Sequence, residues 1–252
     1  MNTHRRQRWT GPGAGPSDLV GSGPPVPYVS CMCLIRFTIC CGLPPDSQAD
    51  LAALVSFVTR RLRGEEVLFL NYGFEEEPPL CILLRAEDER DRAWIQLYHH
   101  VATQVPLRGK SVLEVSCGHG GGAAYVVRTF EPQRYTGVDL NPLAVQFCRR
   151  RHEMEGLVFE PGDSENLPFE ANEFDAVLNV EASQCYLRFA RFLAEVGRVL
   201  RPGGHLLYAD FRVPGTHCRM GTGVRFVAAA DRDSRATKPC WSKGIGGGAI
   251  TP

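Results

Sequence analysis

A glycine-rich turn and an aspartate some way after it are the features of this sequence that could bind a ligand. Gly118 and Gly120 follow a short apolar segment, residues 111–115, and precede a segment with helical periodicity. Because glycine has no Cβ atom, a ligand can come close to the backbone there, and the helix behind the turn offers unused N–H groups. Asp139 ends the next apolar segment, 19 residues after Gly120 (139 − 120). A carboxylate at that place can accept hydrogen bonds from both hydroxyls of a ribose, so the spacing predicts a site for a nucleoside-containing cofactor.

Several cofactors contain a ribose, and the sequence separates them only in part. The carboxylate of Asp139 would repel a 2′-phosphate, which disfavours NADP, and the turn lacks the full GxGxxG pattern of a dinucleotide site. Asp163, followed by Ser164, could accept a hydrogen bond from the exocyclic amine of adenine, although an aspartate there is as typical of a helix cap. A nicotinamide-dependent oxidoreductase therefore remains an alternative at this point.

Strands and helices alternate from residue 111 onward, which is the pattern of an α/β domain. Short apolar runs indicate buried strands, and apolar residues at helical spacing indicate the helices between them. Asn141 and Pro142 are typical of a helix start, and Gly156 is expected to end that helix. This alternation requires right-handed crossovers and a mainly parallel sheet. The expected strands are residues 111–115, 135–139, 157–160, 174–180 and 205–211, and the expected helices are residues 121–130, 141–156 and 189–200.

Composition divides the whole chain into four regions. Residues 1–45 are rich in Pro, Gly and Cys and are expected to be disordered, whereas residues 46–106 are expected to form a helical N-terminal cap with helices near 51–62 and 87–102. Residues 107–213 are expected to form the cofactor-binding core. Residues 214–252 are expected to be an irregular, Gly-rich tail whose only strand-like piece is 224–230.

Charge and cysteine usage exclude several function classes. The 252 residues contain 28 Lys+Arg and 28 Asp+Glu, and a net charge of zero argues against general electrostatic binding of nucleic acid or of an acidic membrane. No apolar run approaches the roughly 20 residues of a transmembrane helix, so no stable membrane insertion is expected. The 10 cysteines lack the spacing of a zinc site, which predicts reduced thiols, no metal and a cytoplasmic location by default, with organellar targeting as a weaker alternative. The oligomeric state is not indicated.

Four segments in the alternating region carry a resemblance to a known family. They are VLEVSCGHGGGAAY, YTGVDLNPLAVQFCRRRH, GDSENLPFEANEFDAVLNVEASQCY and FLAEVGRVLRPGGHLLYADFR. Together they resemble the class I S-adenosylmethionine-dependent methyltransferases, most closely the phthiotriol/phenolphthiotriol dimycocerosates methyltransferase group, O-methyltransferases of the polyketide–lipid type. The resemblance implies S-adenosylmethionine as the cofactor and a Rossmann-like sheet in the order 3-2-1-4-5-7-6. This chain supplies five of those strands, so the last two are expected to be missing and the fifth to be an exposed edge.

The resemblance places the cofactor at residues near the carboxyl ends of the expected strands. The loop after the first strand would surround the methionine part, Asp139 would hold the ribose, and Asp163 would hold the adenine amine. Leu140 would lie beside the adenine, and Asn179 would line the opening through which the methyl group passes. The cofactor-binding residues that the resemblance implies are Glu114, Ser116, Gly118, Gly120, Asp139, Leu140, Asp163, Ser164 and Asn179.

The resemblance also implies a reaction, which is methyl transfer to a small, apolar or lipid-like acceptor, with oxygen as the favoured atom. Glu181 would face the acceptor and is the candidate catalytic residue, ahead of His119 and His152 as proton acceptors. Residues 71–74 (NYGF) resemble the short N-terminal element that covers the cofactor in this group. The alternative is a truncated form that binds S-adenosylmethionine weakly and has little or no catalytic activity, because a Gly-rich end replaces part of the substrate wall.

Overall fold

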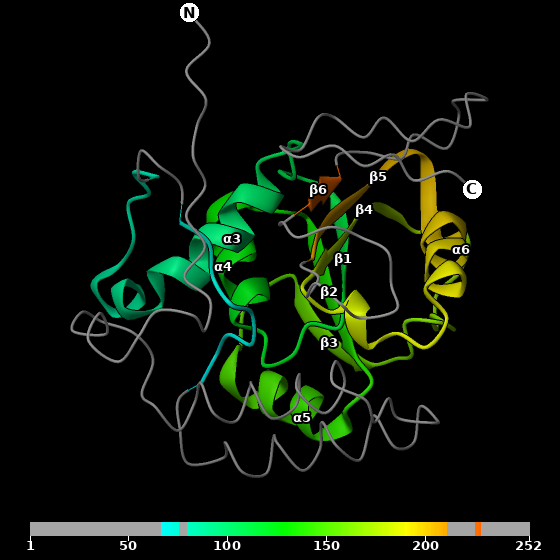
Figure 1. Ribbon diagram of the computed structural model, residues 1–252, viewed down its shortest axis with the longest axis horizontal. Helices are drawn as coiled ribbons and strands as arrows, with labels where there is room; N and C mark the ends of the chain where they lie inside the picture. Colours follow the sequence, from blue (N-terminus) through cyan, green and yellow to red (C-terminus); the bar gives the residue numbers. More distant parts are fainter. Residues whose placement is uncertain (1–66, 76–79, 211–224, 228–252) are drawn as a thin grey trace, which may run out of the picture.

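The structure is a computed structural model, and it describes residues 67–75, 80–210 and 225–227 (Figure 1). Three expectations lie outside the described residues: disorder in residues 1–45, a helix near 51–62, and an irregular tail over 214–252, apart from residues 225–227.

One six-stranded sheet forms the centre of the described part, in the order β3-β2-β1-β4-β5-β6. β1 to β5 are parallel, which confirms the expected order 3-2-1-4-5. β1 is buried along its whole length, as its continuous apolar character predicts for a strand with helices on both sides. The strands are β1 (Ser111–Val115), β2 (Arg134–Asp139), β3 (Leu157–Pro161), β4 (Phe174–Val180), β5 (Leu200–Asp210) and β6 (Arg225–Val227).

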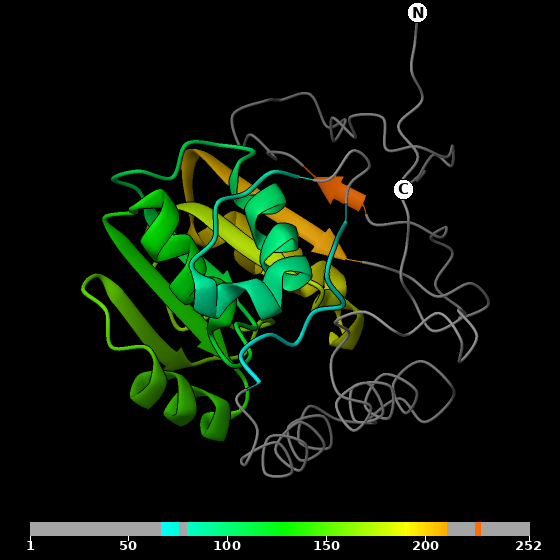
Figure 2. The same ribbon diagram turned by 90° about the vertical axis from the view of Figure 1, so that its left-hand side faces the viewer.

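Helices cover both faces of this sheet (Figures 1 and 2). On one face, Val101 of α3, Val126 of α4 and Val145 of α5 share an apolar cluster with the strands. On the other face, Phe192 and Val196 of α6 belong to a second cluster. The helices are η1 (Ala86–Asp91), α3 (Arg92–Ala102), α4 (Gly121–Phe130), α5 (Pro142–Arg151), η2 (Ser183–Cys185) and α6 (Phe189–Val199).

Two expected helix boundaries are wrong. The helix expected over 87–102 begins as a tighter 3₁₀ turn, η1, before it continues as α3. The helix that Asn141 caps ends at Arg151 rather than at Gly156. His152 leaves the helical backbone conformation there, and its Nε2 donates to the carbonyl of His119 at 2.8 Å. Gly156 instead has a φ of +76° in the turn that leads into β3.

The fifth strand is not a bare edge, which corrects the expectation from the missing family strands. β6 pairs with it antiparallel, with Tyr208 opposite Val227 and Asp210 opposite Arg225. Its position, 225–227, falls within the strand-like piece seen in the sequence. Within the described ranges, no helix is both long enough and apolar enough to cross a membrane.

Candidate functional site

The candidate site lies at the carboxyl ends of β1, β2 and β4, where the strand order reverses between β1 and β4. Ligands of open parallel sheets bind at such a reversal point. The turn after β1 has left-handed backbone at Ser116, Gly118 and Gly120, with φ of +62°, +58° and +75°. A Cβ atom on Gly120 would lie 2.9 Å from atoms of His152 and Phe159, so this glycine is required for close packing as well as for its conformation.

Asp139 is joined directly to the glycine turn. Its Oδ2 accepts from the N–H of Gly118 and its Oδ1 from the N–H of Asn141, both at 2.9 Å. The side chain is 9% exposed. Burial raises the pKa of Asp139 to about 6, although the two backbone hydrogen bonds oppose this rise. The carboxylate is therefore held in place beside the turn while its remaining lone pairs can accept further hydrogen bonds.

Asp163 lies at the same edge of the sheet as Asp139. The N–H of Gly162 donates to the carbonyl of Asp139 at 3.0 Å, which joins the ends of β2 and β3. The carboxylate of Asp163 accepts from the N–H of Glu165 at 2.8 Å, so it caps a turn rather than a helix. Ser164 beside it is buried, and Leu140 is half-buried at the end of β2.

Glu114 points away from the glycine turn and into the core. Its two oxygens accept from the hydroxyls of Tyr98 at 2.7 Å and Tyr135 at 2.8 Å. Burial raises the pKa of Glu114 to about 7, and the two tyrosine hydroxyls lower it by a smaller amount. The two oxygens thus bind tyrosines that tie α3 and β2 to β1.

Ser116 and Asn179 are joined by Tyr186, a residue that sequence reasoning did not single out. The hydroxyl of Tyr186 lies 2.8 Å from Ser116 Oγ and accepts from Asn179 Nδ2 at 2.6 Å. Asn179 Nδ2 also donates to the carbonyl of Val115 at 3.0 Å. The feature of the sequence that could have identified Tyr186 is its position within the segment NVEASQCY, which is part of the family resemblance.

A covering segment, residues 67–75, lies over the glycine turn (Figure 2, cyan). The carbonyl of Leu68 accepts from the N–H of Gly121 at 3.1 Å. The N–H of Tyr72 donates to Glu181 Oε2 at 2.7 Å. Glu181 is buried and has a left-handed φ of +50°. Glu181 thus holds the covering segment in place at the carboxyl end of β4.

The two histidines near the turn contact backbone groups. The Nδ1–H of His119 donates to the carbonyl of Val67 at 2.8 Å, and His152 donates to the carbonyl of His119. Burial lowers the pKa of both histidines, so both are neutral at physiological pH. These contacts make them supports of the turn and of the covering segment.

A second buried carboxylate, Asp210, ends β5 close to Glu181 in the fold. Its Oδ2 accepts from the hydroxyl of Ser183 and from the N–H of Gln184. The hydroxyls of Ser183 and Tyr208 lie 2.6 Å apart. Sequence reasoning missed this cluster, although an acid at a strand end is the signal that revealed Asp139.

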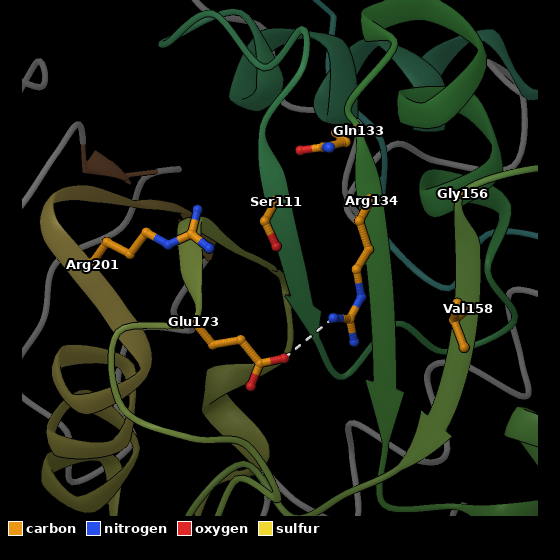
Figure 3. Close-up of a pocket in the computed structure, with 7 residues that line it drawn as sticks. All are labelled: Ser111, Gln133, Arg134, Gly156, Val158, Glu173 and Arg201. Carbon is orange, nitrogen blue, oxygen red and sulfur yellow. Dashed lines mark hydrogen bonds and ion pairs between the residues drawn. The ribbon is translucent and has the colours of Figure 1, made fainter.

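A cavity of about 480 Å³ lies at the opposite, amino end of the sheet (Figure 3). Arg134 there pairs with Glu173 at 3.3 Å, and Arg201 pairs with Asp175 at 3.0 Å. The charges of the two arginines in this cavity are thus neutralised. The cavity is also remote from the carboxyl ends of the strands, where a parallel sheet binds ligands. The lining residues are Ser111, Gln133, Arg134, Gly156, Val158, Glu173 and Arg201.

Comparison with known proteins supports the fold and shows which proteins this chain resembles. A family model described as a methyltransferase domain matches residues 113–208. A phthiotriol/phenolphthiotriol dimycocerosates methyltransferase of Mycobacterium leprae is 57% identical over 155 residues, covering 62% of this chain and 57% of that protein. A fatty-acid O-methyltransferase of Mycolicibacterium smegmatis is 58% identical over 156 residues, with the same two coverages.

The chain thus spans 57% of the length of these two relatives. The structure of a putative sarcosine dimethylglycine methyltransferase from Galdieria sulphuraria aligns with a TM-score of 0.50 at 19% identity, over 65% of this chain and 60% of that one, and supports the fold alone. Residues 113–208 thus match a methyltransferase domain, and over 155 residues the chain is similar to the phthiotriol/phenolphthiotriol dimycocerosates methyltransferases.

Proposed function

We propose that this chain transfers a methyl group from S-adenosylmethionine to an oxygen atom of a small, lipid-like acceptor. The observation that carries the proposal is the direct bond between Asp139 and the glycine turn at the reversal point of the sheet. The acceptor class is inferred from the two relatives, whose names specify dimycocerosate lipids and fatty acids.

The residues at this edge fit the parts of S-adenosylmethionine. Asp139 supplies carboxylate lone pairs for the ribose hydroxyls, and Gly118 and Gly120 keep the turn clear of side chains. Asn179 offers a fully buried Oδ1 atom that has no hydrogen-bond partner among the described residues. A buried polar atom without a partner is costly, and a bound ligand with a donor would remove that cost.

The bound cofactor would supply a methyl group on a positively charged sulfur, a strong electrophile. The protein then has to align the acceptor with that carbon and keep water out. The covering segment supports the second task, because Leu68 and Tyr72 bind the turn and Glu181 through their backbones.

An alcohol acceptor must also lose a proton during the transfer. Glu181 is the candidate proton acceptor, and its carboxylate is oriented by the N–H of Tyr72. A carboxylic acid acceptor is already ionised at neutral pH and needs no such base. The importance of Glu181 should therefore depend on the acceptor.

The test uses the purified full chain, S-adenosylmethionine labelled in its methyl group, and either a long-chain fatty acid or a long-chain diol. We expect label in the lipid phase as a methyl ester or a methyl ether, and no label with Asp139→Ala. Calorimetry should show binding of S-adenosylhomocysteine and not of NAD. If the chain bound NAD but not S-adenosylhomocysteine, the proposed cofactor would be wrong. If it bound S-adenosylhomocysteine but transferred no label to either lipid, the proposed acceptor class would be wrong.

A further inference from the structure

We propose that Tyr186 is a positioning residue that orients the amide of Asn179, so that Asn179 Oδ1 accepts from the α-ammonium group of S-adenosylmethionine. The inference rests on the proposed function, because it concerns the same site. It adds a role for Tyr186, which the family resemblance did not assign.

The first argument is the fixed direction of the Asn179 amide. Its Nδ2 has two acceptors, the carbonyl of Val115 at 3.0 Å and the hydroxyl oxygen of Tyr186 at 2.6 Å. A carbonyl oxygen only accepts, so a flipped amide would place two oxygens face to face. Oδ1 must therefore point the other way. Within the described residues it has no hydrogen-bond partner, and Asn179 is 0% exposed.

The second argument is the direction of the hydrogen bonds through Tyr186. Burial raises the pKa of the Tyr186 hydroxyl above its ordinary value, so the hydroxyl keeps its proton. The oxygen of Tyr186 accepts from Asn179, and Ser116 Oγ, 2.8 Å away, is a partner that can accept its proton. In that arrangement the proton of the Ser116 hydroxyl is left to donate to a ligand.

The chain of hydrogen bonds therefore presents one acceptor, Asn179 Oδ1, and one donor, the Ser116 hydroxyl, at neighbouring strand ends. An α-amino acid carries an ammonium donor and a carboxylate acceptor on the same carbon, which complements this pair. The ring of Tyr186 is supported by Phe192, with ring centres 4.8 Å apart, so the hydroxyl is held from the side of α6. Ser116, which this hydroxyl contacts, has a left-handed φ of +62°.

The experiment compares two ligands by calorimetry. One is S-adenosylhomocysteine, and the other is the same molecule without its α-amino group. The wild-type chain should bind S-adenosylhomocysteine at least about tenfold more tightly, since a charge-assisted hydrogen bond is lost with the amine. Tyr186→Phe should weaken S-adenosylhomocysteine binding by about tenfold and change binding of the deaminated ligand by less than about twofold.

The matched control is Tyr125→Phe, which removes a hydroxyl bonded to His99 at 2.7 Å on the α3–α4 side. It should leave both affinities unchanged. Equal loss for both ligands in Tyr186→Phe would show general loosening of the turn and would overturn the inference. Should that variant fail to fold, equal affinity of the wild-type chain for the two ligands would overturn it just as well. A wild-type chain that binds neither ligand would instead overturn the proposed function.

Discussion

At the scale of single residues, burial sets the properties of Asp139, the carboxylate proposed to hold the ribose. Burial raises the pKa of Asp139 to about 6, more than the N–H groups of Asn141 and Gly118 lower it. The side chain is thus ionised at neutral pH and becomes protonated in mildly acidic solution. A protonated carboxyl group donates one hydrogen bond and loses accepting capacity, so the proposed ribose binding should be coupled to this titration.

The affinity for S-adenosylhomocysteine should therefore fall as the pH drops through 6. We expect a dissociation constant about tenfold higher at pH 5 than at pH 7.5, measured by calorimetry. Asp139→Asn should bind weakly at both pH values. Asp88→Asn alters an acid that pairs with Arg128 on the helices and should keep the wild-type pH dependence. Equal wild-type affinity at the two pH values would contradict the ribose assignment.

Glu114 makes a similar prediction for stability. Burial raises its pKa from 4.5 to about 7, against the lowering effect of Tyr98 and Tyr135. The folded state therefore holds the proton more tightly than the unfolded state. This stabilisation is complete below pH 4.5 and is lost as the pH rises through 7, a change on the order of 3 kcal/mol in the free energy of unfolding.

The glutamine of Glu114→Gln cannot ionise. This variant should therefore lose the part of the pH dependence of the unfolding free energy that Glu114 contributes. Urea denaturation between pH 5 and pH 8 would measure it, with the exposed Glu153→Gln as the control that keeps the wild-type slope. A slope unchanged in Glu114→Gln would mean that Glu114 does not titrate with folding.

At the scale of elements, α3 and α4 meet through a glycine. A Cβ atom on Gly122 would lie 2.0 Å from the ring of Tyr98. Gly122→Ala should therefore destabilise the protein by about 2 kcal/mol, although alanine favours a helix. The control is Gly197→Ala in α6, where a Cβ would meet nothing within 4 Å. That variant should stabilise by up to about 1 kcal/mol, and thermal unfolding that ranked the two variants the other way would refute this packing.

The covering segment and β4 are joined through Glu181, and its contact with Tyr72 can be separated from its proposed role as proton acceptor. Glu181→Gln keeps an acceptor for the Tyr72 N–H, so hydrogen exchange of that amide should stay slow. The glutamine side chain cannot take up a proton, however, so methyl transfer to an alcohol should slow by about 10²-fold or more. Glu181→Ala should lose both properties. Rapid exchange at Tyr72 in Glu181→Gln, or undiminished transfer to the alcohol, would contradict the assignment.

At the scale of the whole molecule, the two ends of the sheet should differ in function. The carboxyl end holds the glycine turn and Asp139, and the amino end holds the cavity with Arg134 and its partner Glu173. Arg134→Ala should leave the affinity for S-adenosylhomocysteine unchanged, whereas Asp139→Ala should weaken it. Because the Arg134–Glu173 pair is partly exposed, its loss should change the free energy of unfolding by less than about 1 kcal/mol. Weaker binding of S-adenosylhomocysteine in Arg134→Ala would contradict a cofactor site at the carboxyl end of the sheet.

Local patterns in the sequence were enough to predict the alternating strands and helices and a mainly parallel sheet, and the family resemblance implied the strand order. Apolar runs, the Asn141–Pro142 helix start and the Gly118–Gly120 turn depend on residues close in the chain, so their geometry follows from backbone preferences and short-range spacing. The end of α5 was misplaced because the side chain of His152 binds the backbone of His119, a distant residue.

Contacts across many residues of the chain were decided by the tertiary structure alone. Tyr186 meets Ser116 across 70 residues, and Tyr72 meets Glu181 across 109. Glu114, which the resemblance implies as a cofactor-binding residue, accepts hydrogen bonds from two buried tyrosines. No local pattern predicts such pairs, because they depend on which side chains the packed helices and strands bring together and on the requirement that buried polar groups find partners.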